Sequence, residues 1–290
     1  MDGPLPLPHE APVQPDSRLS VTIQGEGPNT IVFGNGLSTT QQVWSQVLSY
    51  VPADWRVVRF DYVGTTPATS AHWDAARYQS YAGHAADLGG LLARLEAPRL
   101  LFVGHSMSGM IGALAEVSAP GSMSELFMIG ASPSYVNRED YHGGFSADDV
   151  DGLLRSVDAD LAAWMAGFGP MALGRDATSH QLADFRDTLL ALRPDIGRML
   201  LRSIFTSDHR DVVPNIRCPV SIVQNADDVA VPVAVGAWLA ARTHCVLHEV
   251  LPVSGHLPHV THPTLLGPLL RSACDRVAAS APLTRHPSSH

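Results

Sequence analysis

The chain is organised around one stretch, Leu100-Leu-Phe-Val-Gly104-His105-Ser106-Met107-Ser108, in which an apolar run leads into a turn of small residues. The apolar run predicts a buried strand, and the residues from 107 to 117 predict a helix. A serine in a sharp turn between a strand and a helix is typical of a nucleophile elbow, where a strained backbone aims the hydroxyl out of the sheet. We therefore predict that Ser106 is a nucleophile.

The residues two before and two after Ser106 have to be small, because strand and helix approach each other closely there. Gly104 meets this requirement, whereas Ser108 stands where the pattern has glycine. The alternative is an ordinary Gly/Ser turn. The assignment therefore depends on the surrounding elements and on catalytic partners elsewhere in the chain.

Short apolar runs alternate with helical patterns on both sides of this stretch. Most of the runs are near-continuous, as expected for a parallel sheet that is covered on both faces. Their alternation with helices, for example at 81–95, predicts a doubly wound α/β fold with a mostly parallel sheet. The predicted strands are 31–33, 57–60, 100–103, 126–129, 220–223 and 246–250.

The alternation stops between about residues 137 and 215, where we predict an inserted lid of four helices and no strand. Ser146-Ala-Asp-Asp149 resembles a capping box, and Pro194 suits the first position of a helix. Such a lid covers the carboxyl ends of the strands, where open α/β sheets bind ligands. The predicted helices lie near 146–156, 159–168, 179–192 and 195–205. The predicted core on either side of the lid comprises residues 18–136 and 216–280.

The two ends of the chain have little periodicity. Residues 1–17 predict a flexible arm, and residues 281–290 predict a flexible tail. The length of 290 residues is enough for one large α/β domain with an inserted lid.

Charge and cysteine content narrow the class of partner and the compartment. The formal net charge is −9 and no run of Lys or Arg is present, so we expect neither a nucleic acid nor an anionic membrane as partner. Cys218, Cys245 and Cys274 are odd in number and widely spaced, which favours a reducing compartment over a disulfide framework. No leader pattern and no apolar stretch of membrane-spanning length is found, so we expect a cytoplasmic protein.

A serine nucleophile needs a base, and in this type of fold the chain order is serine, acid, histidine. His256 lies in Val253-Ser-Gly-His-Leu-Pro, directly after the last predicted strand, and is the predicted base. His259 and His262 are nearby competitors. Their spacing resembles a metal pair, but Pro258 disfavours a helical pair of ligands and no third ligand is present, so we predict no metal and no cofactor.

The acid is expected where the strand at 220–223 ends, and Asp227 and Asp228 both qualify. Only one of them can orient the imidazole, and the other is a turn or cap residue. Position in the sequence alone does not choose between them.

The developing oxyanion needs two backbone N–H donors. One is predicted at Met107, directly after the nucleophile. The other is predicted at Leu37 in Gly34-Asn35-Gly36-Leu37, where the glycines allow the backbone to turn an N–H inward. The alternative for this second segment is a plain glycine-rich turn.

Further motifs carry a family resemblance over residues 19–277. With them the chain resembles the α/β-hydrolases related to bacterial RsbQ and to the plant strigolactone and karrikin receptors. The motifs in the lid are the specific ones, since generic α/β-hydrolases lack them. The resemblance implies an α/β-hydrolase fold with a V-shaped lid of four helices. The motifs are Asp61-Tyr-Val-Gly, Arg77-Tyr, Gly104-His-Ser, Tyr141-His-Gly-Gly-Phe, Gly167-Phe-Gly-Pro, Arg193-Pro-Asp-Ile, Ile204-Phe-Thr-Ser-Asp and Gly255-His-Leu-Pro.

The resemblance also implies roles for individual residues. It assigns Ser106 as nucleophile and His256 as base, selects Asp228 rather than Asp227 as the acid, and places Leu37 and Met107 at the oxyanion hole. Two departures bear on the ligand. Many relatives have His-Gly-Phe where this chain has Asn35-Gly36-Leu37, so the mouth of the pocket loses an aromatic ring, and Met107 stands where valine is common.

Five aromatic residues match pocket-lining positions of the plant receptors, and such a pocket suits a hydrophobic ester or lactone of modest size. The alternative is that these rings pack the lid against the core. The residues are Tyr135, Phe145, Trp164, Phe168 and Phe205.

The resulting functional hypothesis is a serine hydrolase of small hydrophobic carboxylic esters or lactones that acts through an acyl-enzyme. The rival hypothesis is a signalling protein that resembles RsbQ or the strigolactone receptors, hydrolyses its ligand slowly and acts through a protein partner. A haloperoxidase or carbon–carbon hydrolase chemistry is a third possibility, against which the lid motifs argue.

Overall fold

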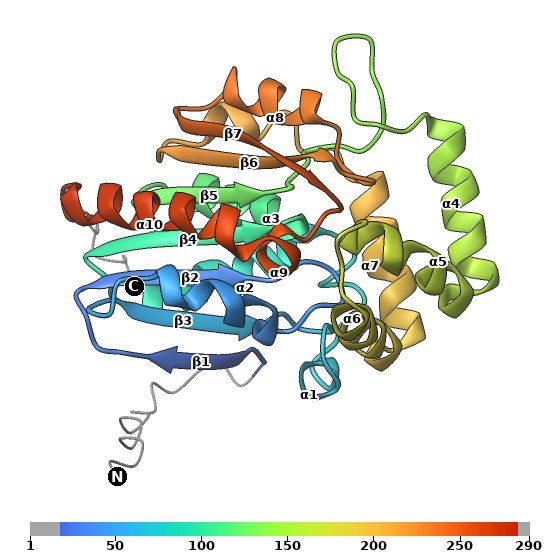
Figure 1. The fold of residues 1–290 in the computed structure, drawn as a ribbon, viewed down its shortest axis with the longest axis horizontal. Coiled ribbons are helices and arrows are strands. Elements are labelled where there is room, and N and C mark those ends of the chain that lie inside the picture. The colour runs from blue at the N-terminus through green and yellow to red at the C-terminus, as the bar shows by residue number, and fades with distance from the viewer. Residues whose placement is uncertain (1–17, 284–290) are drawn as a thin grey trace.

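The computed structural model describes residues 18–283 (Figure 1). The predicted arm at residues 1–17 lies outside the described residues. Of the predicted tail at 281–290, only residues 281–283 are described, and there the N–H of Leu283 donates to the carbonyl of Pro98 at 2.7 Å.

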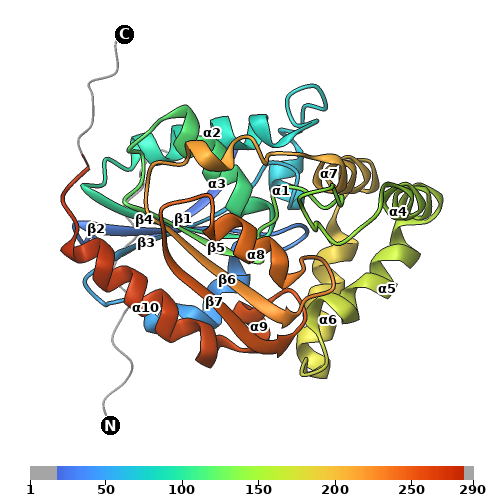
Figure 2. The ribbon, with the colours of Figure 1, turned by 90° about the horizontal axis from the view of Figure 1, so that it is seen from above.

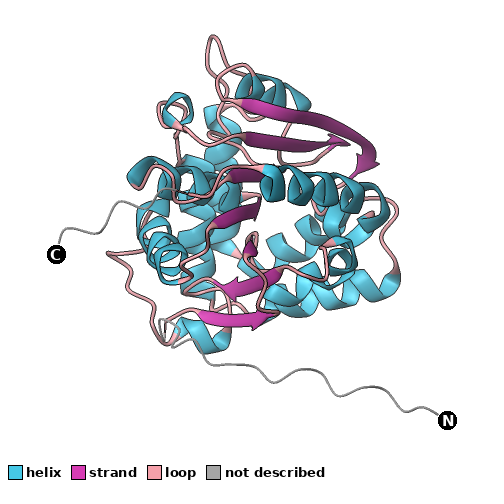
Figure 3. Cartoon of the chain, turned by 90° about the vertical axis from the view of Figure 1, so that its left-hand side faces the viewer, coloured by secondary structure: helices cyan, strands magenta, loops and turns pink. Residues whose placement is uncertain are grey.

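The described residues form one seven-stranded sheet with the order β1-β3-β2-β4-β5-β6-β7. β1 pairs antiparallel with β3, and every other neighbouring pair is parallel. Figure 3 shows the strands stacked across the molecule with helices on either side. The doubly wound, mostly parallel sheet predicted from the sequence is confirmed. The strands are β1 (Ser20–Gln24), β2 (Asn29–Gly34), β3 (Arg56–Asp61), β4 (Arg99–His105), β5 (Glu125–Ile129), β6 (Val220–Asp227) and β7 (Cys245–Ser254).

The burial of each strand explains which ones the sequence revealed. β2 and β5 are buried at every residue, and apart from their first residues their sequences are short apolar runs. β1 was not predicted. It is an edge strand with no buried residue, and its alternation of Val21 and Ile23 with polar residues is too short to stand out.

Two helical layers cover the sheet and enclose two apolar cores. α2, α3 and α8 pack on one face around residues such as Leu88 and Met110. η1 and α10 pack on the other face, where Trp44 and Leu270 are completely buried. No helix within residues 18–283 has the length and apolar character needed to span a bilayer. The elements outside the lid are η1 (Gln41–Tyr50), α1 (Pro67–Ser70), α2 (Tyr81–Arg94), α3 (Met107–Ser118), η2 (Val213–Asn215), α8 (Val233–Ala240), α9 (Pro258–Thr261) and α10 (Pro263–Ala279).

Four helices inserted between β5 and β6 form the lid that the sequence predicted. Figures 1 and 2 show them together at one end of the sheet, on the side to which the arrow of β5 points. The lid therefore lies beyond the carboxyl ends of the parallel strands. Its helices are α4 (Ala147–Ala159), α5 (Leu161–Leu173), α6 (Ser179–Ala191) and α7 (Pro194–Thr206).

The starts of two lid helices follow from local chemistry. The N–H of Ser146 donates to the Asp149 carboxylate at 2.9 Å, and the N–H of Asp149 donates to Ser146 Oγ at 3.1 Å. This is the predicted capping box, with aspartate in place of the usual glutamate. Pro194 occupies the first turn of α7, where its missing N–H has no cost.

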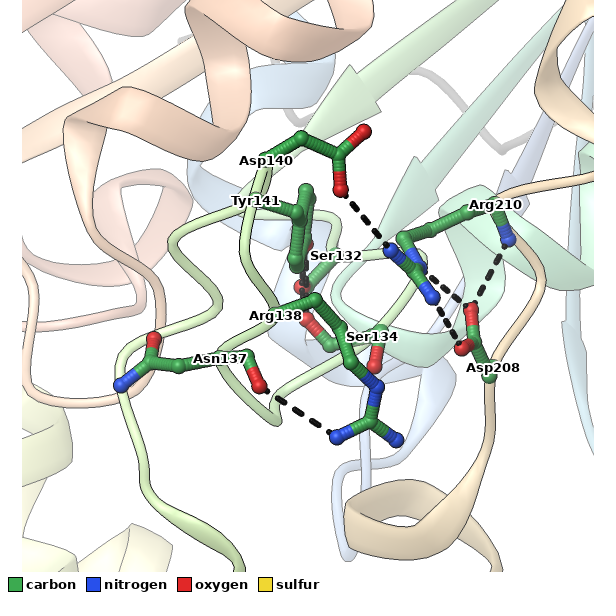
Figure 4. A network of polar contacts seen from close by, with 8 residues as sticks. All are labelled: Ser132, Ser134, Asn137, Arg138, Asp140, Tyr141, Asp208 and Arg210. Atoms are coloured by element: carbon green, nitrogen blue, oxygen red, sulfur yellow. Dashed lines mark hydrogen bonds and ion pairs between the residues drawn. The ribbon is translucent and has the colours of Figure 1, made fainter.

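A polar network joins the segment that enters the lid to the segment that leaves it (Figure 4). The hydroxyl of Tyr141 donates to the carbonyl of Ser134 at 2.7 Å, and the guanidinium of Arg210 lies over the Tyr141 ring, 5.4 Å from its centroid. Arg210 also binds Asp208 through two nitrogens, each at 2.8 Å. The two ends of the lid are therefore held together beside the sheet.

A partly buried ion pair fixes α10 to the sheet at the opposite end of β5. Arg276 donates to both carboxylate oxygens of Glu125, at 2.7 and 3.1 Å, and to Ser221 Oγ at 2.9 Å. The Glu125 side chain is 3% exposed, so the carboxylate depends on these partners.

Arg276→Met removes the cation of this pair and leaves the buried Glu125 carboxylate uncompensated. We expect the free energy of unfolding to fall by about 2–4 kcal/mol, because breaking one side of a buried pair leaves an unpaired charge. Denaturant unfolding followed by circular dichroism measures this change. Arg271→Met is the matched control on the same helix. Arg271 and Asp275 are 54% and 64% exposed, so we expect a loss within about 0.5 kcal/mol. Equal losses in the two variants would contradict a structural role for the pair.

Candidate functional site

Ser106 lies in the turn between β4 and α3 with backbone angles φ 56° and ψ −122°. This conformation is strained for a residue with a side chain. Gly104 is needed because a Cβ at that position would lie 2.6 Å from the backbone of Ser108. The N–H of Ser106 donates to the carbonyl of Ile129 on the neighbouring strand at 2.8 Å, which holds the turn against β5.

Ser108 departs from the glycine of the usual pattern and has a structural reason to do so. Its hydroxyl donates a hydrogen bond to the carbonyl of Asn35, in the loop after β2. The departure therefore ties the helix of the elbow to the loop in which an oxyanion donor is predicted.

His256 and Asp228 are in direct contact. Nδ1 of His256 lies 2.7 Å from Oδ2 of Asp228, and the two side chains are 7% and 1% exposed. The other oxygen of Asp228 accepts the N–H groups of Ala230 at 2.8 Å and Val231 at 3.2 Å. The carboxylate is thus aimed by its own loop. It favours the imidazole tautomer with the proton on Nδ1, which leaves Nε2 as an acceptor.

Asp227 is directed elsewhere. It is the last residue of β6, and its carboxylate pairs with Arg175 at 2.7 Å with both side chains mostly exposed. Of the two aspartates that sequence position left open, the fold brings Asp228 to the imidazole and leaves Asp227 at the surface.

Ser106 and His256 line one cavity, together with Tyr135. Burial raises the pKa of the Tyr135 phenol above its ordinary value, and the Ser106 side chain close to it opposes this rise. Tyr135 therefore remains protonated at neutral pH as a polar neighbour of the serine. Sequence reasoning identified it only as a pocket aromatic.

The loop after β2 passes directly beside the serine. A Cβ at Gly36 would lie 2.5 Å from Nδ1 of His105 and 3.5 Å from Cβ of Ser106, so only glycine fits there. Leu37 follows it and lines the cavity. Met107 is the first residue of α3, so its N–H has no acceptor within the helix. Both predicted oxyanion donors thus belong to segments that border Ser106.

Asn35 holds this loop through buried hydrogen bonds. Its Nδ2 donates to Oδ1 of Asp61 at 3.0 Å, and its Oδ1 accepts from Nε1 of Trp44 at 2.8 Å. Asp61 also accepts from the N–H of Gln41 at 2.7 Å. From the sequence, Asn35 was noted only as a residue that stands where many relatives have histidine. Its role in holding the loop was not apparent, because its partners lie up to 26 residues away in the chain.

His105 is a second contributor that sequence reasoning missed. Its Nε2 lies 2.9 Å from the carbonyl oxygen of His256, which connects the elbow to the loop that carries the imidazole. Burial and then the nearby His259 and His256 hold the pKa of His105 well below its ordinary value. The ring is therefore neutral at neutral pH. The only sequence signal was its place directly before Ser106.

The end of lid helix α5 is joined to the same loop. The N–H of His256 donates to the carbonyl of Ala172, and the N–H of Arg175 donates to Ser254 Oγ at 2.9 Å. Gly174 and Gly255 have positive φ and lie so close that a Cβ on either would meet the other segment's backbone at 2.5 Å. The lid therefore helps to position His256.

The cavity above Ser106 has a free volume of about 40 Å³, which is room for a few water molecules. Tyr135, Trp164, Phe168 and Phe205 line it, and Trp164 stacks on Phe168 at 4.9 Å. Phe145, which was predicted to line the pocket, is not among the residues that line this cavity. Its ring contacts that of Phe205 edge-on, with the centroids 5.7 Å apart. Among the lining residues that the sequence did not reveal, four come from α6 and α7, where their spacing is that of ordinary core packing. They are Phe185, Leu189, Leu201 and Ile204.

The two neighbouring histidines have contacts of different kinds. His259 stacks on Trp44 with ring centroids 4.5 Å apart, and burial, followed by the proximity of His256, lowers its pKa to about 3. His262 lies 3.3 Å from Asp176. Residues 18–283 contain no group of three side chains arranged to hold a metal ion.

Comparison with known proteins gives one consistent family. Residues 31–266 match the model of the alpha/beta hydrolase family. The chain is 36% identical over 253 residues to the karrikin insensitive 2 receptor IA of Petunia hybrida, covering 87% of this chain and 92% of that protein. It is 35% identical over 261 residues to the strigolactone esterase D14 of Arabidopsis thaliana, covering 89% and 97%. A solved hydrolase from Oleispira antarctica superimposes with a TM-score of 0.85 at 28% identity, covering 89% of this chain and 95% of that one.

The two aspartates can be separated by the reactivity of Ser106. We expect a fluorophosphonate to label Ser106, and Asp228→Asn to slow the labelling by about 10²–10⁴-fold, because the imidazole loses its orienting partner. Asp227→Asn is the matched control and should label at nearly the wild-type rate. Labelling is followed by mass spectrometry of the intact protein. The reverse order of the two variants would show that the neighbouring carboxylate is the functional one.

Proposed function

Because the chain belongs to the alpha/beta hydrolase family and is related to the karrikin and strigolactone receptors, we propose that it is a serine hydrolase. Its substrate is a small hydrophobic carboxylic ester or lactone, and the reaction proceeds through an acyl-enzyme at Ser106. The observation that carries the proposal is the 2.7 Å contact between Asp228 and His256 beside the cavity that Ser106 lines.

In this mechanism His256 takes the proton of the Ser106 hydroxyl as the oxygen attacks the ester carbonyl. The N–H groups of Leu37 and Met107 stabilise the oxyanion of the tetrahedral intermediate. His256 then returns the proton to the leaving oxygen, and the acyl group stays on Ser106. A water molecule, activated by the same imidazole, hydrolyses the acyl-enzyme and restores the serine.

Asp228 holds the imidazole in the productive tautomer and stabilises the imidazolium that forms during each step. The two backbone donors on its other oxygen support this role, since they prevent the carboxylate from rotating away from His256. The neutral rings of His105 and His259 add no positive charge that would oppose imidazolium formation.

The volume of the cavity supports a limit on the size of the acyl group. A free volume of about 40 Å³ with aromatic walls suits a short apolar acyl chain or a small lactone ring. Trp164 and Phe168 form the outer part of this wall from α5, and both rings are only partly buried.

The second candidate is a signalling protein that binds and slowly hydrolyses its ligand and acts through a protein partner. It is favoured by the identity of 35–36% to proteins named a karrikin receptor and a strigolactone esterase. The number of turnovers per protein molecule distinguishes the hydrolase from the signalling protein. Many turnovers per minute on a panel of short esters and butenolide lactones support the hydrolase, whereas roughly one turnover per protein supports the receptor.

We expect Ser106→Ala to abolish hydrolysis of p-nitrophenyl acetate while the fold is retained. Loss of the nucleophile should lower kcat/KM by several orders of magnitude, on the order of 10³ or more. Hydrolysis is followed by p-nitrophenolate absorbance and folding by circular dichroism. Activity within about tenfold of the wild type, equivalent to about 1.4 kcal/mol, would exclude Ser106 as the nucleophile.

We expect Trp164→Ala to shift the preference of the enzyme toward longer acyl chains, because the cavity is small and this ring forms part of its outer wall. The ratio of kcat/KM for p-nitrophenyl butyrate to that for the acetate should rise by about tenfold, the scale of one or two methylenes in an apolar pocket. Thermal unfolding is the control. An unchanged ratio with a large drop in melting temperature would show that the ring only packs the lid.

A further inference from the structure

A groove of about 670 Å³ opens on the surface beside the cavity, and the mechanism above does not use it. Its two walls are η1 and lid helix α6, and the segment around α9 lies between them. Figures 1 and 2 both place α6 beside α9, where Nε2 of Gln181 donates to the carbonyl of Val260 at 2.8 Å. α9 in turn packs against η1.

The groove and the cavity share a partition of three side chains, Thr39, Phe185 and Leu257. The cavity has less than a tenth of the volume of the groove, at about 40 Å³ against about 670 Å³. A substrate with more than a short acyl group therefore has to extend out of the cavity, and the groove is the space directly across the partition.

The partition lies on the side from which the leaving group departs. Leu257 follows His256, and the imidazole has to reach the leaving oxygen in order to return the proton. The alcohol part of an ester is therefore on the His256 side, where the groove begins. The acyl part points toward the aromatic wall formed by Tyr135, Phe168 and Phe205.

The groove is lined by hydroxyl and carboxamide groups that alternate with apolar side chains. Gln42, Ser45 and Gln46 of η1 are exposed, and their side chains form no hydrogen bond within the described residues. None of the lining residues is Lys or Arg, and His180 and Asp184 pair with each other at 2.7 Å. The lining thus offers hydrogen-bond donors and acceptors, but no free cation that could bind an anionic group. This combination matches an uncharged, polar occupant.

We propose that this groove binds the alcohol part of the substrate and makes the enzyme selective for short-acyl esters of uncharged alcohols that carry several hydroxyl or amide groups. The inference rests on the proposed hydrolase function and adds the class of leaving group to it. Hydrolysis releases a short carboxylic acid and the polar alcohol. Water supplies the hydroxyl to the acyl carbon, and its proton replaces the one given to the leaving oxygen.

The test compares two esters with the same acyl group, glycerol monoacetate and n-butyl acetate. We expect the wild type to prefer the glycerol ester in kcat/KM by about tenfold, and the double variant Gln42→Leu/Gln46→Leu to lower this preference by about three- to tenfold, the effect of one or two lost neutral hydrogen bonds. Gln24→Leu is the matched control, because Gln24 is an exposed glutamine at the end of β1, outside the groove. Release of acetate is measured by pH-stat titration.

The possible outcomes separate this inference from the proposed function. Hydrolysis that depends on Ser106 but shows no preference for the glycerol ester, or a preference that the double variant retains in full, overturns the groove assignment alone. Absence of Ser106-dependent hydrolysis of both esters overturns the proposed function and this inference with it. A preference that falls in the double variant and persists in Gln24→Leu supports the assignment.

Discussion

The close approach of β4 and α3 controls the geometry around Ser106. No side chain fits at Gly104, and Ser106 adopts a positive φ that costs on the order of 1–3 kcal/mol. The surrounding fold sustains this strain, because the turn is bonded to β5 through Ile129 and both strands are buried on both faces. The strain is useful, since it projects the serine hydroxyl beyond the edge of the sheet, where side chains from other loops can reach it.

The other groups reach Ser106 because the carboxyl ends of parallel strands share one edge of the sheet. Each is then held by buried hydrogen bonds of its own. Asn35 fixes the loop after β2, two backbone N–H groups fix Asp228 after β6, and His105 fixes the backbone of His256 after β7. Apolar packing alone does not set such orientations, whereas a buried polar group without its partner is costly.

The lid takes part in this arrangement as well as covering it. Its middle is bonded to the His256 loop through Ala172 and the Gly174–Gly255 contact, and its two ends are held together by Tyr141 and Arg210. The same helices leave a small apolar cavity over Ser106 and a larger, more polar groove beside it. One insertion thus both aligns the imidazole and divides the space available to a substrate into two compartments of different size and polarity.

The sequence by itself determined the type of fold, the four lid helices, the elbow at Ser106 and the place of His256 after the last strand. These features depend on local periodicity and on the order of elements, which are readable along the chain. It did not reveal β1, whose short alternation is weak. Sequence position did not distinguish Asp227 from Asp228 either. The two residues are adjacent at the end of β6 and differ only in the direction in which their side chains point. The tertiary structure turned Asp228 toward His256 and Asp227 toward Arg175, and it set the volumes of the cavity and the groove. Those outcomes depend on contacts between residues that are far apart in the chain, such as Ser108 with Asn35 and His105 with His256, and only the folded chain brings such residues together.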